Sequence, residues 1–281
     1  MTYRTRFAPS PTGPLHLGHA FSALTAHDRA RAFGGDFLLR IADIDRARSK
    51  AEFEQQIYED LAWLGLSWPQ PVLRQSDRLP AYRAALDQLI AQGLCYPCRC
   101  TRGDIRAALS APQEGATHGP DGLIYPGTCR NRSMAEAHPN DSIRLNMRAA
   151  MAKLDAPLTF SETGPLHTGQ HQITLGQMIA QTGDIVLARR DMGTSYHLSV
   201  TVDDAYQNIT EVVRGTDLFE ATRIHILLQS LLKLPHPTYH HHDLIRDEIG
   251  KRLAKRDDAR AIVKYRAEGA TPQDIRDMVS S

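Results

Sequence analysis

Apolar residues in the first 95 positions of the chain alternate between short continuous runs and helical spacing. The short runs predict strands at residues 3–8, 37–42 and 72–75. Apolar residues three or four positions apart predict helices at about 19–33, 50–64 and 78–92, each followed by glycine. Alternating strands and helices are typical of an α/β fold with parallel strands and crossover helices.

The pattern changes between about residues 95 and 140. This segment has no sustained periodicity, is rich in Gly, Pro, Asn and His, and contains all four cysteines. We expect an insertion that is stabilised by something other than an apolar core. Beyond it, strands are predicted at 142–147, 184–190, 209–215 and 238–245, and helices at 195–206 and 217–232. The last thirty or so residues are charged and weakly periodic.

Composition excludes several classes of protein. The 281 residues carry 33 Lys and Arg against 32 Asp and Glu, so binding to nucleic acid would need a local basic patch. No run reaches the roughly 18 apolar residues of a membrane span. The start, MTYRTRFAPSPTG, has no apolar run after its basic residues, so we expect no secretory signal. These features predict a cytoplasmic protein, in which clustered cysteines favour a metal or catalysis over disulfides.

The segment RFAPSPTGPLHLGH, residues 6–19, has the most specific chemistry in the chain. Its prolines keep the chain extended between a strand and a helix, and two histidines, His16 and His19, then flank Gly18 at the helix start. Free N–H groups and the helix dipole favour an anion there, and glycine allows its close approach. The alternative is a structural pair of histidines near a helix cap.

A second basic segment, GKRLAKR at 250–256, lies far downstream. Lys255 in such a loop could bind a phosphate as a mobile point charge. A solvated basic surface is the alternative for this segment taken alone.

Together these segments resemble the two signatures of class I aminoacyl-tRNA synthetases, the glutamyl subgroup in particular. RLAKR at 252–256 is similar to the second signature, usually written KMSKS. Three further segments are similar to glutamyl-enzyme segments in the same order: LLRIADIDR (38–46), YHLSVTVDD (196–204) and TEVVRGTDL (210–218). The resemblance covers roughly residues 3–258. It implies a Rossmann-type catalytic domain with a zinc-containing insertion and a short helical C-terminal portion.

The resemblance also implies a reaction and its residues. Glutamate is activated with ATP and Mg²⁺ as an adenylate, and the acyl group then passes to RNA. The catalytic residues carried over are His16, His19 and Lys255, which with Gly18 also bind ATP. The residues carried over for glutamate binding are Arg6, Phe7, Ala8, Pro9, Ser10, Ala42, Tyr196 and Arg214.

This sequence departs from the family pattern at three positions. Ala42 stands where an acidic residue is expected to hold the substrate's ammonium group, so that role falls to Asp43, Tyr196 or water. In the second signature, Arg252 replaces the first Lys and Ala254 replaces Ser. Without the resemblance, Tyr196 would be interpreted as a core residue of a helix.

Three other polar features near these segments have structural interpretations. Arg214 could cap a strand end or form an ion pair, and Asp203-Asp204 is interpreted as helix-end charge rather than a metal pair. His240, His241 and His242 cannot easily converge on a metal, since adjacent residues of a strand point to opposite faces.

The four cysteines predict a tetrahedral zinc site. Cys95, Cys98, Cys100 and Cys129 form the simplest ligand set, and unmetallated thiols are the alternative. The spacing resembles a zinc insertion of one synthetase branch in which a Tyr oxygen is the fourth ligand. That resemblance implies one structural zinc held by Cys98, Cys100, Tyr125 and Cys129, and favours Tyr125 over Cys95, with His118 a more distant candidate.

Only 25 residues follow Arg256, so we expect no anticodon-binding domain. A truncated branch of the glutamyl family with this zinc spacing attaches glutamate to the queuosine base in the anticodon of tRNA(Asp). The predicted partners are therefore ATP, L-glutamate and queuosine-bearing tRNA(Asp), and no membrane. Candidate phosphate contacts near the zinc insertion are Arg99, Arg102, Arg130 and Arg132.

We divide the chain into four parts on this basis. Residues 1–94 and 184–235 are the two halves of the catalytic domain, 95–183 contain the zinc insertion and an acceptor-type subdomain, and 236–281 contain the second signature and C-terminal helices. A monomer is expected. The alternatives are a compact glutamyl-tRNA synthetase charging a tRNA 3′ end, a small-molecule adenylating enzyme, and a zinc-bearing RNA-binding protein without catalysis.

Overall fold

Three parallel strands from the amino-terminal part of the chain form one sheet in the order β1-β2-β3. They and their connecting helices are β1 (Arg4–Phe7), α1 (Leu17–Ala32), β2 (Asp36–Ile41), α2 (Ala51–Trp63) and β3 (Leu73–Arg74). β2 pairs in parallel with both β1 and β3. The computed structural model describes residues 2–109, 118–245 and 260–280. The expected α/β alternation is confirmed over this region, because buried apolar strands require crossover helices to cover them.

Strands from the second half of the chain form a four-stranded sheet in the order β11-β12-β8-β9. They are β8 (Leu158–Glu162), β9 (Gly169–Ile173), β11 (Glu211–Gly215) and β12 (Thr238–His242). β12 lies between β11 and β8 and is parallel to both, and β9 forms an antiparallel hairpin with β8. At the end of β1, the Thr210 amide donates to the Arg4 carbonyl at 3.0 Å. The two sets of strands therefore meet at β1 and β11.

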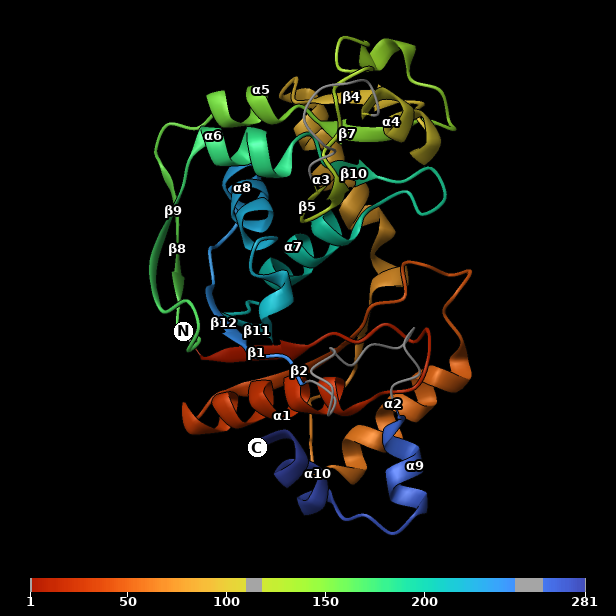
Figure 1. The fold of residues 1–281 in the computed structure, drawn as a ribbon, viewed down its shortest axis with the longest axis vertical. Helices are drawn as coiled ribbons and strands as arrows, with labels where there is room; N and C mark the ends of the chain where they lie inside the picture. The colour runs from red at the N-terminus through yellow and green to blue at the C-terminus, as the bar shows by residue number, and fades with distance from the viewer. Residues whose placement is uncertain (1, 110–117, 246–259, 281) are drawn as a thin grey trace.

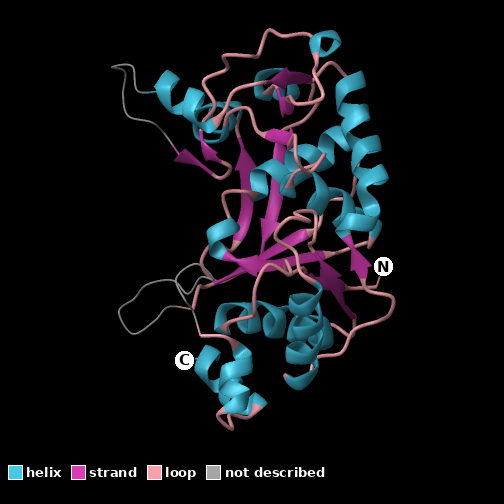
Figure 2. Cartoon of the chain, turned by 90° about the vertical axis from the view of Figure 1, so that its right-hand side faces the viewer, coloured by secondary structure: helices cyan, strands magenta, loops and turns pink. Residues whose placement is uncertain are grey.

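Helices cover both sides of the strands (Figures 1 and 2). Figure 1 shows α1 and α7 (Tyr196–Tyr206) on opposite sides of β1. Neighbouring residues of β1 accordingly point in opposite directions: Thr5 donates through its hydroxyl to the Ala26 carbonyl of α1, whereas Arg6 reaches Asp204 of α7. This alternation places Arg6 on the α7 side of the sheet.

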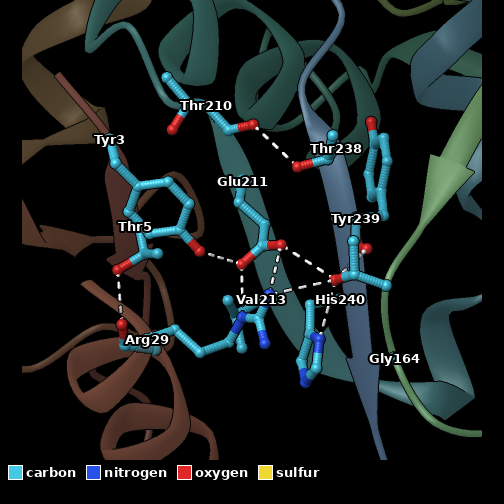
Figure 3. Close-up of polar contacts among 12 residues, drawn as sticks. Tyr3, Thr5, Arg29, Gly164, Thr210, Glu211, Val213, Thr238, Tyr239 and His240 are labelled. Carbon is cyan, nitrogen blue, oxygen red and sulfur yellow. Dashed lines mark hydrogen bonds and ion pairs between the residues drawn. The ribbon is translucent and has the colours of Figure 1, made fainter. Parts of the chain in front are cut away.

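A polar cluster around Glu211 ties β1, α1 and β11 together (Figure 3). The buried Glu211 carboxylate accepts from the Tyr3 hydroxyl and from the Arg29 guanidinium. It also accepts a hydrogen bond from the Thr163 hydroxyl at 2.9 Å. Burial would raise the pKa of Glu211, but these donors outweigh it and keep the pKa below its usual range.

Short elements occupy the segment that lacks periodicity. Apart from the β8–β9 hairpin, the α-helices and strands between β3 and α7 are, in chain order, α3 (Leu79–Ala91), β4 (Cys95–Cys98), α4 (Arg102–Leu109), β5 (His118–Gly119), β6 (Gly122–Leu123), β7 (Ser142–Leu145), α5 (Met147–Ala152), α6 (Leu175–Gln177) and β10 (Val186–Ala188). β7 pairs antiparallel with β4 and β10. Among the described residues, the buried apolar cluster here has five members, Tyr96, Cys98, Ile105, Tyr125 and Cys129. So small a core agrees with an insertion held by other forces.

The carboxyl-terminal half differs from the predicted pattern in two places. α8 (Thr222–Leu232) begins five residues later than expected, because Thr216–Leu218 form a separate 3₁₀ turn. The β8–β9 hairpin was not predicted. α9 (Ile262–Ala267) and α10 (Pro272–Ser280) form the expected helical C-terminal portion, and Ile275 and Val279 of α10 pack into the cluster beside α1. No helix in the described parts of the chain has the length and apolar character to cross a membrane.

Candidate active site

A cavity of about 380 Å³ lies where β1, the start of α1, α7 and β11 meet. Eight of the predicted site residues line it: Arg6, Phe7, Ala8, His16, Gly18, His19, Tyr196 and Arg214. These residues are up to 208 positions apart in the chain, and the fold alone brings them together. The expected clustering of the two histidines with the glutamate-pocket residues is thus present.

The two histidines form the first turn of α1. His16 is the N-cap residue with extended backbone (φ −125°, ψ 175°), and its amide donates to Nδ1 of His19 at 3.2 Å. The two ring centroids are 3.8 Å apart. A Cβ at Gly18 would lie 3.1 Å from Cε1 of His16, so glycine leaves room for this ring over the helix start. The arrangement presents two imidazoles and the positive end of a helix dipole to the cavity.

Arg6 is held at the cavity wall by a buried ion pair. Its Nε and a terminal nitrogen donate to the two oxygens of Asp204 at 2.9 and 3.2 Å, and Arg40 donates to the same carboxylate at 2.7 Å. Burial would raise the pKa of Asp204, but the two guanidinium groups outweigh it and hold the pKa below its usual range. One carboxylate therefore meets two cations, which leaves this wall with positive charge.

The sequence pattern indicated that Asp203 and Asp204 are simple helix-end charges, and the structure corrects this interpretation. Both are buried, and they face different clusters. Asp203 accepts from Gln75, Arg78 and Tyr82 at 2.7 to 2.9 Å, away from Arg6. Helical geometry explains the separation, because consecutive residues point about 100° apart. This also excludes the metal-pair interpretation.

Arg214 is the centre of a buried network. Its nitrogens donate to Nε2 of His241, Nδ1 of His225, the Leu218 carbonyl and the Thr222 hydroxyl, at 2.8 to 3.2 Å. Four of the five guanidinium N–H groups are thus used inside the protein. Within the described residues no carboxylate contacts Arg214 directly, so its charge is not neutralised by an adjacent acid.

Histidines extend this network in both directions. His241 contacts Glu162 at 2.5 Å, whereas His225 contacts Nδ1 of His197 at 3.1 Å, and Nε2 of His197 lies 3.5 Å from Asp121. Burial is the main cause that lowers the pKa of His241 to about 4 and the pKa of His225 well below its usual value. Neutral imidazoles therefore position Arg214 from both sides.

Three residues predicted for the glutamate pocket stand behind the cavity wall. Pro9 accepts at its carbonyl from the Ala42 amide at 2.9 Å, and the Ser10 hydroxyl lies 3.4 Å from that of Thr12. Pro9, Ser10 and Ala42 do not line the cavity. Their backbone contacts instead tie the proline-rich turn to the end of β2.

Of the two side chains expected to contact the substrate's ammonium group, Tyr196 lines the cavity and Asp43 does not. Asp43 accepts from both the amide and the hydroxyl of Ser76, at 2.8 and 2.6 Å, so its carboxylate is already engaged. Tyr196 is 41% exposed and lines the cavity, which excludes a core role. Asp217 and Asp243 are the carboxylates that line the cavity. Sequence reasoning missed both, although Asp217 belongs to the TEVVRGTDL segment.

Two predicted features of the C-terminal part remain, the second signature and the three histidines of β12. Lys255, together with Arg252 and Ala254, lies outside the described residues. The three histidines of β12 point in alternate directions, as predicted. His240 contacts Thr163, His241 contacts Glu162, and Nε2 of His242 lies 2.8 Å from the Ser22 hydroxyl at the cavity.

Three cysteines converge in the insertion. The Sγ atoms of Cys98, Cys100 and Cys129 all lie within 4.8 Å of one another, and those of Cys100 and Cys129 are 3.6 Å apart. The Tyr125 hydroxyl lies 3.4 Å from Sγ of Cys98 and 3.3 Å from Sγ of Cys100. Zn–S bonds of about 2.3 Å in a tetrahedron separate two sulfurs by about 3.8 Å. The spacing of these four atoms fits such an ion.

The fourth cysteine stays apart from this cluster. Cys95 starts β4, pairs with Leu145 and packs against the main apolar core, where burial raises its pKa to about 12. In contrast, burial would raise the pKa of Cys129, but hydrogen bonds, chiefly with Tyr125, outweigh this effect and lower the pKa to about 7. Cys129, whose lowered pKa favours the thiolate that binds a cation, therefore lies inside the cluster. His118 lies on β5 and does not join it.

Comparison with known proteins agrees with this geometry. The family model described as the catalytic domain of class I tRNA synthetases (E and Q) matches residues 2–280. A glutamyl-Q tRNA(Asp) synthetase of Rhodobacter capsulatus is 62% identical over 98% of this chain and 99% of its own length. The chain belongs to the glutamyl-Q synthetase branch of the class I (E and Q) family. The resemblance inferred from the sequence motifs is thereby confirmed.

Other members of the class share the fold of this synthetase. A glutamyl-Q tRNA(Asp) synthetase of Albidiferax ferrireducens is 42% identical over 92% of the chain and 86% of its own length. A crystal structure of a glutamate-tRNA synthetase from Elizabethkingia anophelis matches the whole chain with a TM-score of 0.79 and 27% identity. The chain spans 61% of that longer protein. The methionyl-tRNA synthetase of Mycobacterium tuberculosis, at a TM-score of 0.60 and 11% identity, shares the fold.

Proposed function

We propose that this synthetase activates glutamate with ATP and transfers it to the queuosine base in the anticodon of tRNA(Asp). The observation that supports this function is the end-to-end similarity to a glutamyl-Q tRNA(Asp) synthetase, 62% identical over 98% of the chain. The cavity at the start of α1 supplies the matching chemistry, because it combines two imidazoles with buried guanidinium groups. Such a ligase would work in the cytoplasm with its tRNA.

The first step is adenylate formation. The glutamate carboxylate attacks the α-phosphate of ATP, and pyrophosphate leaves with its Mg²⁺. His16 and His19 would donate hydrogen bonds to charge that develops on the α-phosphate, and Gly18 would let the nucleotide approach the backbone. Lys255 is assigned to the leaving pyrophosphate by its place in the second signature.

Glutamate recognition follows from the positive wall of the cavity. Arg6 has two N–H groups left after its bonds to Asp204 and the Val213 carbonyl, and Arg214 has one. We assign the substrate's side-chain carboxylate to these groups, with Tyr196 beside them. In the second step a hydroxyl of the queuosine ring attacks the acyl carbon of the adenylate, an ester forms, and AMP leaves with release of the hydroxyl proton. This step requires the RNA loop to enter the same cavity.

The cysteine cluster is assigned to structural zinc. Cys98, Cys100 and Cys129 with Tyr125 would complete four-coordinate binding, which leaves no position for a substrate. When bound, the ion would supply folding free energy to a segment that has a very small core.

The test is a reaction of the enzyme with ATP, Mg²⁺, labelled glutamate and tRNA(Asp), with and without queuosine. Mass spectrometry of the nuclease-digested product should find glutamyl-queuosine, and only in queuosine-bearing tRNA. Product on queuosine-free tRNA would instead support charging of the 3′ end and contradict the proposed substrate. Absence of glutamate-dependent ATP–pyrophosphate exchange would contradict catalysis altogether.

A further inference from the structure

A second and larger cavity, of about 940 Å³, lies beside the cysteine cluster. Its walls come from α4, β5–β6, β7, β10 and the loop that precedes α7. No residue predicted for the active site or for the four-ligand zinc set lines it except Cys100. Its size is at the upper end of the range of ligand pockets.

Positive charge dominates the lining of this larger cavity. Five arginines and three aspartates contribute to it. One of those aspartates, Asp184, is already paired with Arg130 at 2.7 Å, and a second, Asp121, lies 3.5 Å from His197. Arginines therefore outnumber aspartates in the lining by two, and one of the aspartates is paired with an arginine outside it.

Two of the arginines present their charge from one helix. Arg102 and Arg106 are one turn apart on α4, and both are exposed. Within the described residues neither side chain makes a hydrogen bond or an ion pair, unlike Arg132, which binds Asp141 at 2.9 Å. Arg102 and Arg106 are thus available to an external anion.

A buried arginine, Arg144, forms part of the cavity wall. Arg144 is 8% exposed, lies 4.0 Å above the Tyr125 ring centroid and donates to the Asp184 carbonyl. Its Nε is buried with no hydrogen-bond partner in the structure, which is an unfavourable arrangement unless a ligand supplies an acceptor. Ile105, Leu109 and Leu123 add apolar surface to the same walls.

The start of α7 connects the walls of the two cavities. Tyr196 lines the active site, while its neighbour His197 contacts Asp121 in the wall of the larger cavity. Arg190, just before α7, also lines the larger cavity and reaches the Cys100 carbonyl at 3.5 Å. A chain of nucleotides could therefore extend from one cavity to the other around this helix start.

We propose that the larger cavity binds an unpaired nucleotide of the RNA substrate that flanks the base modified in the active site. Arg102 and Arg106 contact its phosphates, and the base lies against the apolar wall near Arg144. The ligand class rests on the proposed function, since it takes the substrate to be an RNA loop. Unpaired, splayed bases and their phosphates are the usual targets of specific RNA recognition.

The test compares the R102A/R106A double variant with wild type and with R83A/R148A, which removes two exposed arginines outside both cavities. The probes are an RNA hairpin with the anticodon stem and loop of tRNA(Asp), and a blunt RNA duplex with the same stem. Binding is measured by fluorescence anisotropy at several salt concentrations without ATP or glutamate. Glutamate-dependent pyrophosphate exchange monitors the fold and the active site.

We expect R102A/R106A to weaken hairpin binding by about tenfold or more and to reduce the salt slope by about 1.4. Exchange activity and duplex binding should be unchanged, and the control variant should match wild type. Unchanged hairpin binding in R102A/R106A would overturn the proposal. Equally weakened binding of the duplex would also overturn it, because the two arginines would then act through a general electrostatic attraction to RNA. Normal hairpin binding by a wild type that transfers no glutamate would contradict only the proposed function.

Discussion

Tyr125 has a position that its sequence neighbourhood alone does not explain. Its hydroxyl accepts from the Cys129 amide at 2.9 Å and faces two thiols, while its ring supports Arg144. Burial, and then its hydrogen bonds to the thiols, raise the pKa of Tyr125, so the phenol is neutral unless a cation is near. A bound dication would favour the ionised form of the phenol and make its oxygen a ligand.

Metal content distinguishes Tyr125 from Cys95 as the fourth ligand. We expect about one zinc per chain in wild type and in C95A, and loss of zinc from C129A and Y125F after dialysis against a chelator. Elemental analysis of the dialysed proteins measures this directly. Retention of zinc in Y125F together with its loss in C95A would favour the four-cysteine site.

At the scale of elements, α7 is fastened to β1 and β2 by a single carboxylate. Asp204 accepts from Arg6 of β1 and Arg40 of β2, and all three side chains are at most 6% exposed. The same contact orients Arg6 toward the active-site cavity. Asp203, one position earlier, fastens α7 to Arg78 and Tyr82 on the other side.

Removal of the Asp204 charge should destabilise the fold strongly. In D204N two guanidinium groups stay buried without a counter-charge, and we expect the free energy of unfolding to fall by about 3–5 kcal/mol. The matched control is D36N, which breaks the half-exposed pair with Arg4 and should cost at most about 1 kcal/mol. Urea denaturation of both variants measures the difference. Similar losses in the two variants would contradict this role for Asp204.

At the scale of the whole molecule, a line of buried polar groups runs from the hairpin strand β8 to the wall of the larger cavity. Glu162, His241, Arg214, His225 and His197 follow one another within hydrogen-bond distance, and Asp121 ends the line. The imidazoles of His241 and His225 must stay neutral, because burial lowers their pKa values and disfavours the charged form. The line joins the sheet, the active site and the insertion.

Stability should therefore fall in mildly acidic solution. The unfolded His241 has a pKa of about 6.5, and the folded pKa is lowered to about 4. The contribution of neutral His241 to the free energy of unfolding is fully present above about pH 6.5 and is lost as the pH falls toward 4. The total loss is on the order of 3 kcal/mol. Carboxylates with lowered pKa values, such as Asp204, lose their contribution at lower pH, below about 4.

The variant H241Q should flatten this pH dependence between about pH 6.5 and pH 4. H138Q, which changes an exposed histidine, should leave it as in wild type. Urea unfolding at a series of pH values gives the slopes. An H241Q slope equal to that of wild type would show that His241 takes up its proton in the folded protein without cost.

Local spacing was sufficient to predict most of the sheet and helix order. Apolar runs and helical periods depend on neighbours within a few residues, so β1, α1, β2 and α2 were predictable. The weakly apolar β8–β9 hairpin was not, because its pairing with β12 is a long-range contact. The motif at residues 6–19 also pointed to residues that line one cavity, since its prolines, glycine and histidines lie within one turn and one helix start.

Tertiary structure alone decided which charges meet. The sequence indicated that Arg214, Asp203 and Asp204 carry charge, but their partners lie on other elements, and a pair can be assigned only when the fold sets the distance. The same holds for the cavity formed by arginines of α4 and the α7 loop. Local pattern determines elements, whereas burial and desolvation, which depend on every packed neighbour, determine how their side chains function.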